Sequence, residues 1–359
     1  MTRGIAAALL LLAGGSGCCA CAYTPTFTVR NDAALRPPAA PPLPPPVLRV
    51  LHFGDFGEDT CQQQAVAAAM ASAHARAPFD MGLAVGDLVY DCGPDDTLPG
   101  AEACTFAPDG NTVAPGFVPP ADPSFAVHDG PLAFLGAVPV HVALGNHDVA
   151  TWCRPPGPNT ARLKACLSVA HTSPQWVTPG RHHVIDRGAV RFLVIDANLV
   201  VRDYGGFSLD DEVAFVAAES AACADRLCFL VGHHPPATAG QHRTDANPGY
   251  LARMQRVLDA GGGRIRAYLA GHDHDLQHLR TPAGLDVFVS GNGALARWHE
   301  DFDWSSAGAA LLFASMRWGY GVVEITPGGW RYRFEDDASR ALYCCVATGD
   351  GPCEPVSCG

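Results

Sequence analysis

Short apolar runs alternate with helix-like segments along the chain from Val47 onward. The runs have the length and composition of buried strands, and they cover residues 47–53, 81–85, 138–144, 190–195, 227–231, 266–270 and 286–290. Helices are predicted over 62–77, 208–223 and 250–260, and Ser208 and Asp211 are spaced as a capping box. Residues 321–325 and 330–334, joined at Pro327-Gly328-Gly329, predict a terminal hairpin. This alternation is typical of a layered α/β protein.

Five short polar motifs, each led by a glycine, follow strand-like runs in chain order. They are Gly54-Asp55-Phe56-Gly57, Gly86-Asp87-Leu88-Val89-Tyr90, Gly145-Asn146-His147-Asp148, Gly232-His233-His234-Pro235 and Gly271-His272-Asp273-His274. Taken alone, each motif also fits a turn or a helix cap. As a series they place carboxylates, an amide, a phenol and imidazoles at strand ends, where open α/β sheets bind ligands. Since a buried carboxylate is costly unless paired or metal-bound, the series predicts a site for two metal ions.

The order of these motifs resembles that of the calcineurin-like metallophosphoesterases, over roughly residues 47 to 343. Most members of that family begin with Asp-x-His, whereas Gly57 stands at the histidine position here. Tyr90, three residues after Asp87, resembles the replacement found in the purple acid phosphatase branch. The segment from Gly271 to Gln277 is similar to that of the small, tartrate-resistant type. The resemblance implies a four-layer α-β-β-α sandwich with its active site at the carboxyl-end loops of the strands.

The resemblance also implies a set of seven metal ligands. A ferric ion would take Asp55, Tyr90 and His274; a divalent ion would take Asn146, His233 and His272; and Asp87 would bridge the two. An independent chemical argument supports iron, because a phenol with a pKa of about 10 ionises in acid only beside a strong Lewis acid. The divalent ion could be Fe, Zn or Mn, since imidazole and amide ligands do not choose among them.

Beyond the ligands, the resemblance implies that His147 and His242 contact the phosphate and assist proton transfer to the leaving group, with Asn146 also beside the substrate. His234 is expected on the pocket wall, and His278, which follows the last motif, on the wall or the surface. Asp148 is interpreted either as orienting His147 or as a turn former, and it stays outside the ligand set.

The function expected on this basis is hydrolysis of phosphate monoesters by in-line attack of a metal-bound hydroxide. A phosphodiesterase or nucleotide pyrophosphatase with the same metals is the alternative, because substrate choice resides in loops such as 93–130 and 234–250. A non-catalytic surface binding protein would be expected to lack at least one ligand, and none of the seven is missing.

The N-terminal region predicts export. Residues 1–22 have the features of a signal peptide, and Ala20-Cys21-Ala22 fits a cleavage site. Gly15-Ser16-Gly17-Cys18 alternatively resembles a lipoprotein signal with lipidated Cys18. Residues 23–46 form a linker in which seven of the ten residues from 37 to 46 are proline. We therefore expect a periplasmic, outer-surface lipoprotein or secreted protein, with a catalytic domain at 47–343 and a cysteine-rich tail at 344–359.

The 14 cysteines suit an oxidising compartment. Proximity in sequence suggests disulfides Cys92–Cys104, Cys153–Cys166 and Cys223–Cys228, with Cys344 and Cys345 bonded to Cys353 and Cys358, so Cys61 is left over. A zinc cluster is disfavoured because no CxxC pair is present beyond the signal segment. Residues 93–130 form a Pro/Gly-rich insertion, expected to be either a lid or a surface loop pinned by a disulfide.

The charge composition excludes one class of partner. A net charge of −12 and the lack of a Lys/Arg cluster argue against a nucleic-acid partner. The expected partner is a small phosphorylated substrate, the chain is expected to be a monomer, and a lipid on Cys18 would tether it to a membrane.

Overall fold

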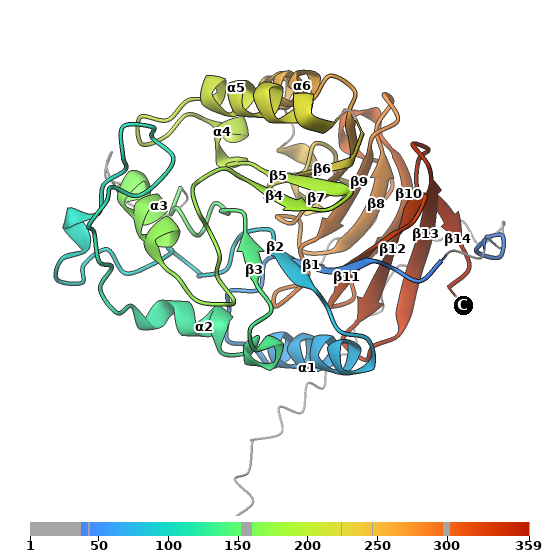
Figure 1. Ribbon diagram of the computed structural model, residues 1–359, viewed down its shortest axis with the longest axis horizontal. Helices are drawn as coiled ribbons and strands as arrows, with labels where there is room; N and C mark the ends of the chain where they lie inside the picture. The colour runs from blue at the N-terminus through green and yellow to red at the C-terminus, as the bar shows by residue number, and fades with distance from the viewer. Residues whose placement is uncertain are drawn as a thin grey trace, which may run out of the picture.

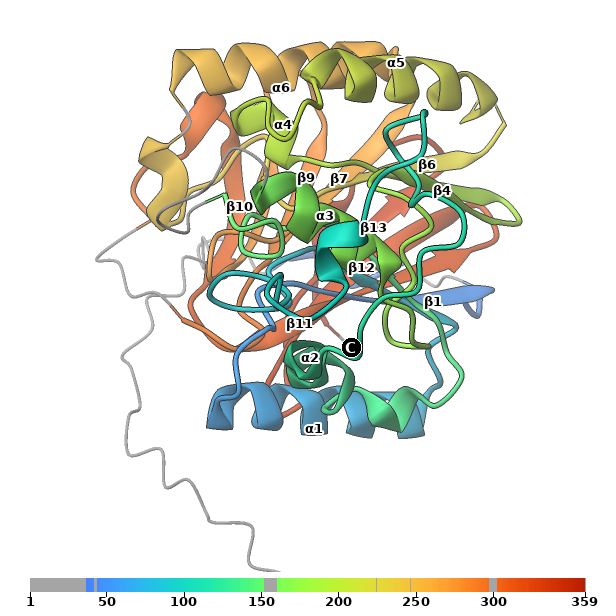
Figure 2. The ribbon, with the colours of Figure 1, turned by 90° about the vertical axis from the view of Figure 1, so that its left-hand side faces the viewer.

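Two seven-stranded sheets packed face to face form the centre of the molecule (Figure 1). The computed structural model describes residues 37–41, 44–151, 160–223, 225–245, 247–296 and 302–358. Helix α1 (Cys61–Arg76) lies along one outer side, and α5 (Leu209–Ser220) and α6 (Pro248–Ala260) lie side by side along the other (Figure 2). The α-β-β-α sandwich expected from the sequence is therefore confirmed.

The first sheet joins the start of the domain to its end. Its order is β14 (Glu354–Val356), β13 (Ala341–Thr348), β12 (Gly329–Asp336), β11 (Gly319–Thr326), β1 (Leu48–Phe53), β2 (Met81–Ala84) and β3 (Val140–Val142). Strands β1, β2 and β3 are parallel, and the others pair antiparallel. The loops after β1, β2 and β3 consequently leave the sheet at one edge.

The second sheet has the same mixed character. Its order is β10 (Ala310–Ser315), β8 (Leu276–Arg280), β9 (Asp286–Ser290), β7 (Ile265–Ala270), β6 (Leu227–Val231), β5 (Val190–Val194) and β4 (His183–Arg187). Strands β5, β6, β7 and β9 are parallel neighbours. The shorter helices are α2 (Ala126–Asp129), α3 (Thr160–Ala170) and α4 (Asn198–Val201).

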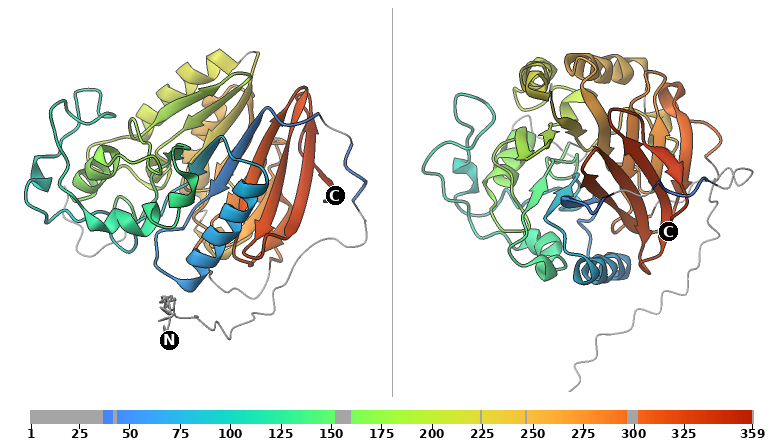
Figure 3. Two further views of the ribbon diagram at one scale, coloured as in Figure 1. Left: turned by 60° about the horizontal axis from the view of Figure 1, so that its bottom comes forward. Right: turned by 45° about the vertical axis from the view of Figure 1, so that its right-hand side comes forward.

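The two sheets face each other in layers (Figure 3), and aromatic side chains fill the space between them. Trp330 and Tyr332 of β12 alternate with outward-facing arginines and pack onto Phe288 of β9, with Tyr332 stacked on Phe288 at a ring distance of 4.0 Å. Burying such rings contributes about 1.5–3 kcal/mol each. The period-two alternation of side chains along β12 therefore selects the residues that join the sheets.

The predicted elements agree with the structure except at their ends. The capping box of α5 is present, with the Ser208 N–H donating to the Asp211 carboxylate at 3.1 Å. The sequence pattern did not predict β4, β8, β10, β13 or β14. The boundary expected after residue 343 falls inside β13, so residues 344–356 continue the first sheet.

Two of the expected disulfides are wrong. Cys104 bonds to Cys166 of α3, because the 93–130 insertion folds back on that helix instead of closing on itself. Cys61 and Cys92 are both disulfide-bonded, so Cys61 is not left over. Cys223–Cys228 is confirmed, and Cys344–Cys358 and Cys345–Cys353 lie within the expected group. Cys153 lies outside the described residues.

The cross-link between Cys104 and Cys166 favours the interpretation of the insertion as a pinned surface loop. Lys164 of α3 adds a second attachment, donating to the Pro94 carbonyl at 2.7 Å. At the other end of the molecule, the N–H of Ser357 donates to the carbonyl of Pro38, so the proline-rich segment meets the sheet beside β14. Within the described part of the chain, none of the helices has the length and apolar character needed to span a bilayer.

Candidate dinuclear metal centre

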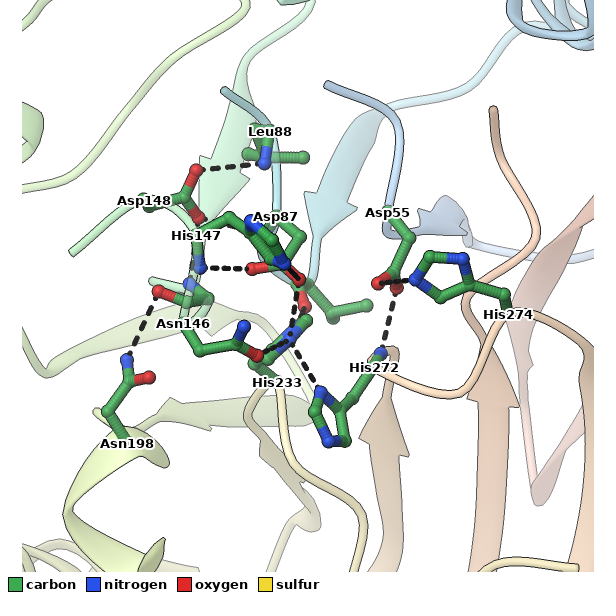
Figure 4. A network of polar contacts seen from close by, with 12 residues as sticks. Asp55, Asp87, Leu88, Asn146, His147, Asp148, Asn198, His233, His272 and His274 are labelled. Atoms are coloured by element: carbon green, nitrogen blue, oxygen red, sulfur yellow. Dashed lines mark hydrogen bonds and ion pairs between the residues drawn. The ribbon is translucent and has the colours of Figure 1, made fainter. Parts of the chain in front are cut away.

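The five polar motifs meet where the carboxyl ends of parallel strands from both sheets converge (Figure 4). Asp55, Asp87 and Asn146 follow β1, β2 and β3 of the first sheet, while His233 and His272 follow β6 and β7 of the second. Parallel strands deliver their following loops to a common edge, which explains the convergence. The site therefore lies across the junction of the sheets.

One half of this site is rich in oxygen donors. The phenol oxygen of Tyr90 lies 3.2 Å from Asp55 Oδ1, 3.2 Å from Asp87 Oδ2 and 3.3 Å from His274 Nε2. His274 Nε2 also lies 3.3 Å from Asp55 Oδ1. These four side chains thus direct their donor atoms toward one small volume.

The other half is rich in imidazoles. His233 Nε2 lies 3.0 Å from Asn146 Oδ1, 3.2 Å from His272 Nδ1 and 3.2 Å from Asp87 Oδ2. The same oxygen of Asp87 therefore faces both halves. The seven side chains that the sequence singled out form two donor groups that share one carboxylate.

The protonation pattern of His233 tests whether this donor set fits a metal. Its Nδ1 donates to the Val85 carbonyl at 2.8 Å, so the neutral imidazole presents a lone pair at Nε2. That lone pair faces the carboxylate and amide oxygens and a second imidazole nitrogen. Two ligands held about 2.1 Å from an octahedral ion at right angles lie roughly 3 Å apart. The donor set therefore fits a cation, and the Val85 carbonyl fixes the tautomer that a ligand needs.

Burial makes the charges at the site depend on one another. Burial alone would raise the pKa of Asp87, but His233 and His147 hold it well below its ordinary value. Burial likewise opposes the charged form of His233, yet the Asp87 carboxylate outweighs it and raises the pKa of His233 to about 9. Burial, reinforced by Asp87 and Asp55, raises the pKa of Tyr90 well above 10. The phenol consequently stays neutral unless a cation binds beside it.

Three of the converging residues have left-handed backbone conformations, with φ of 52° at Asp55, 55° at Asp87 and 72° at His272. Each such residue costs on the order of 1–3 kcal/mol. Specific hydrogen bonds hold the bends: Asp55 Oδ2 accepts the His272 N–H at 2.8 Å, and Asp87 Oδ1 accepts the His147 N–H at 2.8 Å. The first of these bonds links the two sheets. Backbone strain is thus concentrated where the donors converge.

The first motif leaves no space for a histidine side chain at position 57. A β-carbon on Gly57 would lie 2.1 Å from the carbonyl carbon of Leu88, because the second motif packs directly against this glycine. The Gly57 N–H donates to the Asp87 carbonyl, and the Tyr90 N–H donates to the Gly57 carbonyl. The backbone that excludes a side chain at position 57 therefore also places Tyr90 at the site.

Asp148 is the residue whose role the sequence left open. Its buried carboxylate accepts the N–H groups of Asp87, Leu88, Val89 and Gly145 at 2.7–3.1 Å. It does not orient His147, whose Nδ1 donates instead to the Asp91 carbonyl at 2.6 Å. Asp148 ties the second motif to the third. Its position directly after Asn-His in a buried loop was the only signal in the sequence.

His147 and His242 lie at opposite sides of the donor groups. The ring of His147 lies 4.3 Å from that of Tyr90, and its Nε2 is 3.9 Å from Asp87 Oδ2. The ring of His242 stacks on His272 at 4.3 Å, and its Nδ1 donates to Asp245 at 2.6 Å. Asp245 was not predicted from the sequence. Both histidines are anchored through Nδ1 and keep Nε2 available.

His234 lies beside the donor groups, whereas His278 does not line the site. His234 is buried beside His272, with ring centres 4.3 Å apart. His278 was expected on the wall or surface, but it is buried between the sheets, bonded to Tyr343 at 2.6 Å and Asp286 at 3.1 Å. His278 is therefore a structural histidine.

Comparison with known families agrees with this geometry. The family model for calcineurin-like phosphoesterases matches residues 48–276, which contain all five motifs. The chain belongs to this family. The arrangement of the two sheets around the donor groups is that of a calcineurin-like phosphoesterase. The family resemblance inferred from the sequence is therefore confirmed.

Individual relatives show which members of the family the chain resembles. The chain is 23% identical to the tartrate-resistant acid phosphatase type 5 of Sus scrofa over 328 residues, covering 84% of this chain and 86% of the relative. A shorter match of 83 residues to the Homo sapiens protein of the same name is 31% identical and covers 23% of this chain and 24% of that one. This calcineurin-like phosphoesterase is thus a hydrolase, and its likeness to acid phosphatases implies a dinuclear metal centre.

Solved structures support the fold. A purple acid phosphatase from yellow lupin seeds superposes with a TM-score of 0.56 at 14% identity, covering 87% of this chain and 55% of that one. GAP50, described as an anchor in the inner membrane complex of Plasmodium, superposes with a TM-score of 0.61 at 17% identity, covering 85% and 90%. At these identities the likeness concerns the fold alone.

Proposed function

We propose that this protein is a dinuclear metal-dependent acid phosphatase that hydrolyses phosphate monoesters. The observation that carries the proposal is the position of Asp87, whose Oδ2 lies 3.2 Å from both Tyr90 Oη and His233 Nε2. One carboxylate oxygen between two donor groups is the arrangement expected of a bridging ligand. The acid phosphatase name of the pig relative supports the same reaction class.

In this proposal Asp55, Tyr90 and His274 hold a ferric ion, and Asn146, His233 and His272 hold a divalent Fe, Zn or Mn ion. The neutral phenol of Tyr90 ionises only beside a strong Lewis acid, which assigns the trivalent ion to its half of the site. When bound, the two ions would lower the pKa of a coordinated water and neutralise charge on the phosphoryl group. Asp87 would fix the spacing between them.

The protein's own histidines would complete the reaction. His147 and His242 keep Nε2 available, and both flank the donor groups, so they are placed to hydrogen-bond to phosphate oxygens. The hydrogen bond from His242 Nδ1 to Asp245 fixes the orientation of the ring, so Nε2 would be directed at the leaving group as general acid catalysis requires. The amide of Asn146 would lie beside the same phosphate.

The expected cellular context follows from the N-terminal region and the cystines. Disulfides such as Cys104–Cys166 persist in oxidising compartments, which supports export. The signal segment and Cys18 lie outside the described residues. We propose an exported protein, secreted, periplasmic or tethered through a lipid on Cys18, in which residues 23–46 separate the catalytic domain from the signal segment.

Comparing hydrolysis of p-nitrophenyl phosphate with that of bis-p-nitrophenyl phosphate at mildly acidic pH tests the monoesterase proposal. We expect a kcat/KM for the monoester at least about a hundredfold above that for the diester, because a dianionic phosphate bridges two cations better than a monoanion does. A preference for the diester would establish a phosphodiesterase and overturn the proposal.

A further inference from the structure

We propose that His234 provides an additional imidazole ligand to the divalent half of the metal centre, beside His233 and His272. This inference rests on the proposed function, because it concerns the same centre. It extends the ligand set of the divalent ion to three imidazoles and one amide, with the Asp87 bridge.

The position of the His234 ring supports a ligand role. One ring nitrogen from each of His233, His234 and His272 can be chosen so that all three lie within 4.8 Å of one another. The ring centre of His234 lies 4.9 Å from that of His233 and 4.3 Å from that of His272. Ligands on opposite sides of an ion are separated by about 4.2 Å at bond lengths of about 2.1 Å. Modest side-chain adjustment would bring the three nitrogens around one cation.

The burial of His234 is otherwise unexplained. The side chain is only 3% exposed, and its Nδ1 has no hydrogen-bond partner among the described residues. Leaving a buried polar atom unpaired costs about 1–3 kcal/mol. His52 and His128 also leave one ring nitrogen unpaired, but each ring hydrogen-bonds through its other nitrogen, to Tyr332 and to the Gln175 carbonyl. A cation would satisfy a nitrogen of His234 where the protein does not.

Hydrogen bonds and prolines fix the backbone at His234 and directly after it, as is expected for a metal ligand. Tyr268 of β7 donates to the His234 carbonyl at 3.0 Å, and Tyr250 of α6 donates to the Pro235 carbonyl at 2.5 Å. Two prolines follow, at 235 and 236, and restrict the chain further. Little ordering entropy therefore remains to be lost when the ring binds an ion.

His141 and His183 provide a comparison within the same protein. Both rings lack hydrogen-bond partners among the described residues, as His234 Nδ1 does. Neither of them belongs to a group of three potential ligands in that part of the chain. His183 is 7% exposed and lies on β4, so it is a matched control for the loss of a buried, unpaired imidazole.

The additional ligand has a consequence for metal choice. Two imidazoles and an amide leave Fe, Zn and Mn all possible, but a third imidazole favours Zn or Fe over Mn, which prefers oxygen ligands. A divalent-ion site with three imidazoles should therefore bind zinc with much higher affinity than manganese. Removal of His234 should make the two affinities more similar.

The test compares zinc and manganese binding by the wild-type protein and by the variants His234→Phe and His183→Phe, with iron already loaded. Zinc affinity is measured by competition with a chromophoric chelator, and the thermal midpoint is recorded with and without zinc. We expect His234→Phe to weaken zinc binding at least about tenfold and to reduce the zinc-dependent rise in midpoint. His183→Phe should leave zinc affinity unchanged. If His234→Phe does not fold without zinc, the smaller His234→Ala substitution, which offers no ligand atom, gives the same comparison.

The outcomes separate this inference from the function on which it rests. Equal zinc affinity in wild-type protein and folded His234 variants, or equal weakening by His183→Phe, overturns the ligand role while the phosphatase proposal stands. A wild-type protein that binds no divalent ion beside iron overturns both.

Discussion

The two halves of the metal centre share Asp87 and differ in almost everything else. The Tyr90 half contains a carboxylate, a phenol and one imidazole, whereas the His233 half contains two imidazoles and an amide. The first half can carry two negative charges besides the bridge, and the second carries none. Charge therefore distinguishes the halves, and it is the physical reason for assigning a trivalent ion to one and a divalent ion to the other.

The halves are alike in one respect, because each draws ligands from both sheets. Asp55 follows β1 and His274 follows β7, and on the other side Asn146 follows β3 and His233 follows β6. A bound ion would thus connect the first sheet to the second at the same edge where Asp55 accepts the His272 N–H. Metal binding should therefore stabilise the packing of the sheets as well as create the reactive centre.

The largest expected effect follows from removing the shared ligand. Asp87→Asn keeps the size of the side chain but removes the negative charge that both halves use. We expect loss of both ions and a fall in kcat/KM on the order of a thousandfold or more, because several kcal/mol of charge stabilisation is lost. Elemental analysis and steady-state kinetics measure the two effects.

Asp210→Asn, at an exposed position on α5, is the control for that experiment and should retain both ions. If Asp87→Asn protein retains both ions and a kcat/KM within tenfold of wild type, Asp87 is not shared by the two halves of the metal centre.

A smaller effect is expected from Asp148→Asn. This substitution changes the residue that holds the second and third motifs together, and it removes none of the seven proposed ligands. The amide cannot accept four backbone N–H groups as the carboxylate does, so the loops carrying Asp87 and Asn146 lose their common anchor. We expect divalent-ion affinity and kcat/KM to fall by about 10–100-fold, with less effect on iron. Chelator competition for each ion measures the difference.

Asp109→Asn is the matched control, because Asp109 also accepts backbone N–H groups but lies in an exposed loop of the insertion. If Asp148→Asn left both affinities unchanged, Asp148 would be a turn former with no positioning role.

Local patterns were sufficient to predict much of this molecule. The apolar runs predicted the parallel strands, and glycine-led polar motifs at their ends predicted the residues that converge, since both signals lie within a few adjacent residues. Gly57 and Tyr90 predicted the exchange of one ligand. The sequence could not show that Leu88 fills the space beside Gly57, because that contact depends on how two loops pack.

Features that depend on distant contacts were not predictable in the same way. The Cys104–Cys166 bond depends on the path of the insertion across α3, so pairing by proximity failed. Asp148 binds backbone groups about sixty residues away, and nothing in its neighbourhood identifies them. The burial of His278 depends on β13, a strand whose pattern was not recognised.

The central claim is that Tyr90 makes one half of the centre ferric, and metal analysis combined with a visible absorption spectrum of the purified protein tests it most directly. We expect two metal ions per chain, one of them iron, and a broad visible band from a phenolate bound to Fe(III). Tyr90→Phe should abolish the band, whereas Asn146→Ala, in the other half, should leave it in place. A colourless wild-type protein containing only zinc or manganese, or a band that survives Tyr90→Phe, would contradict the account.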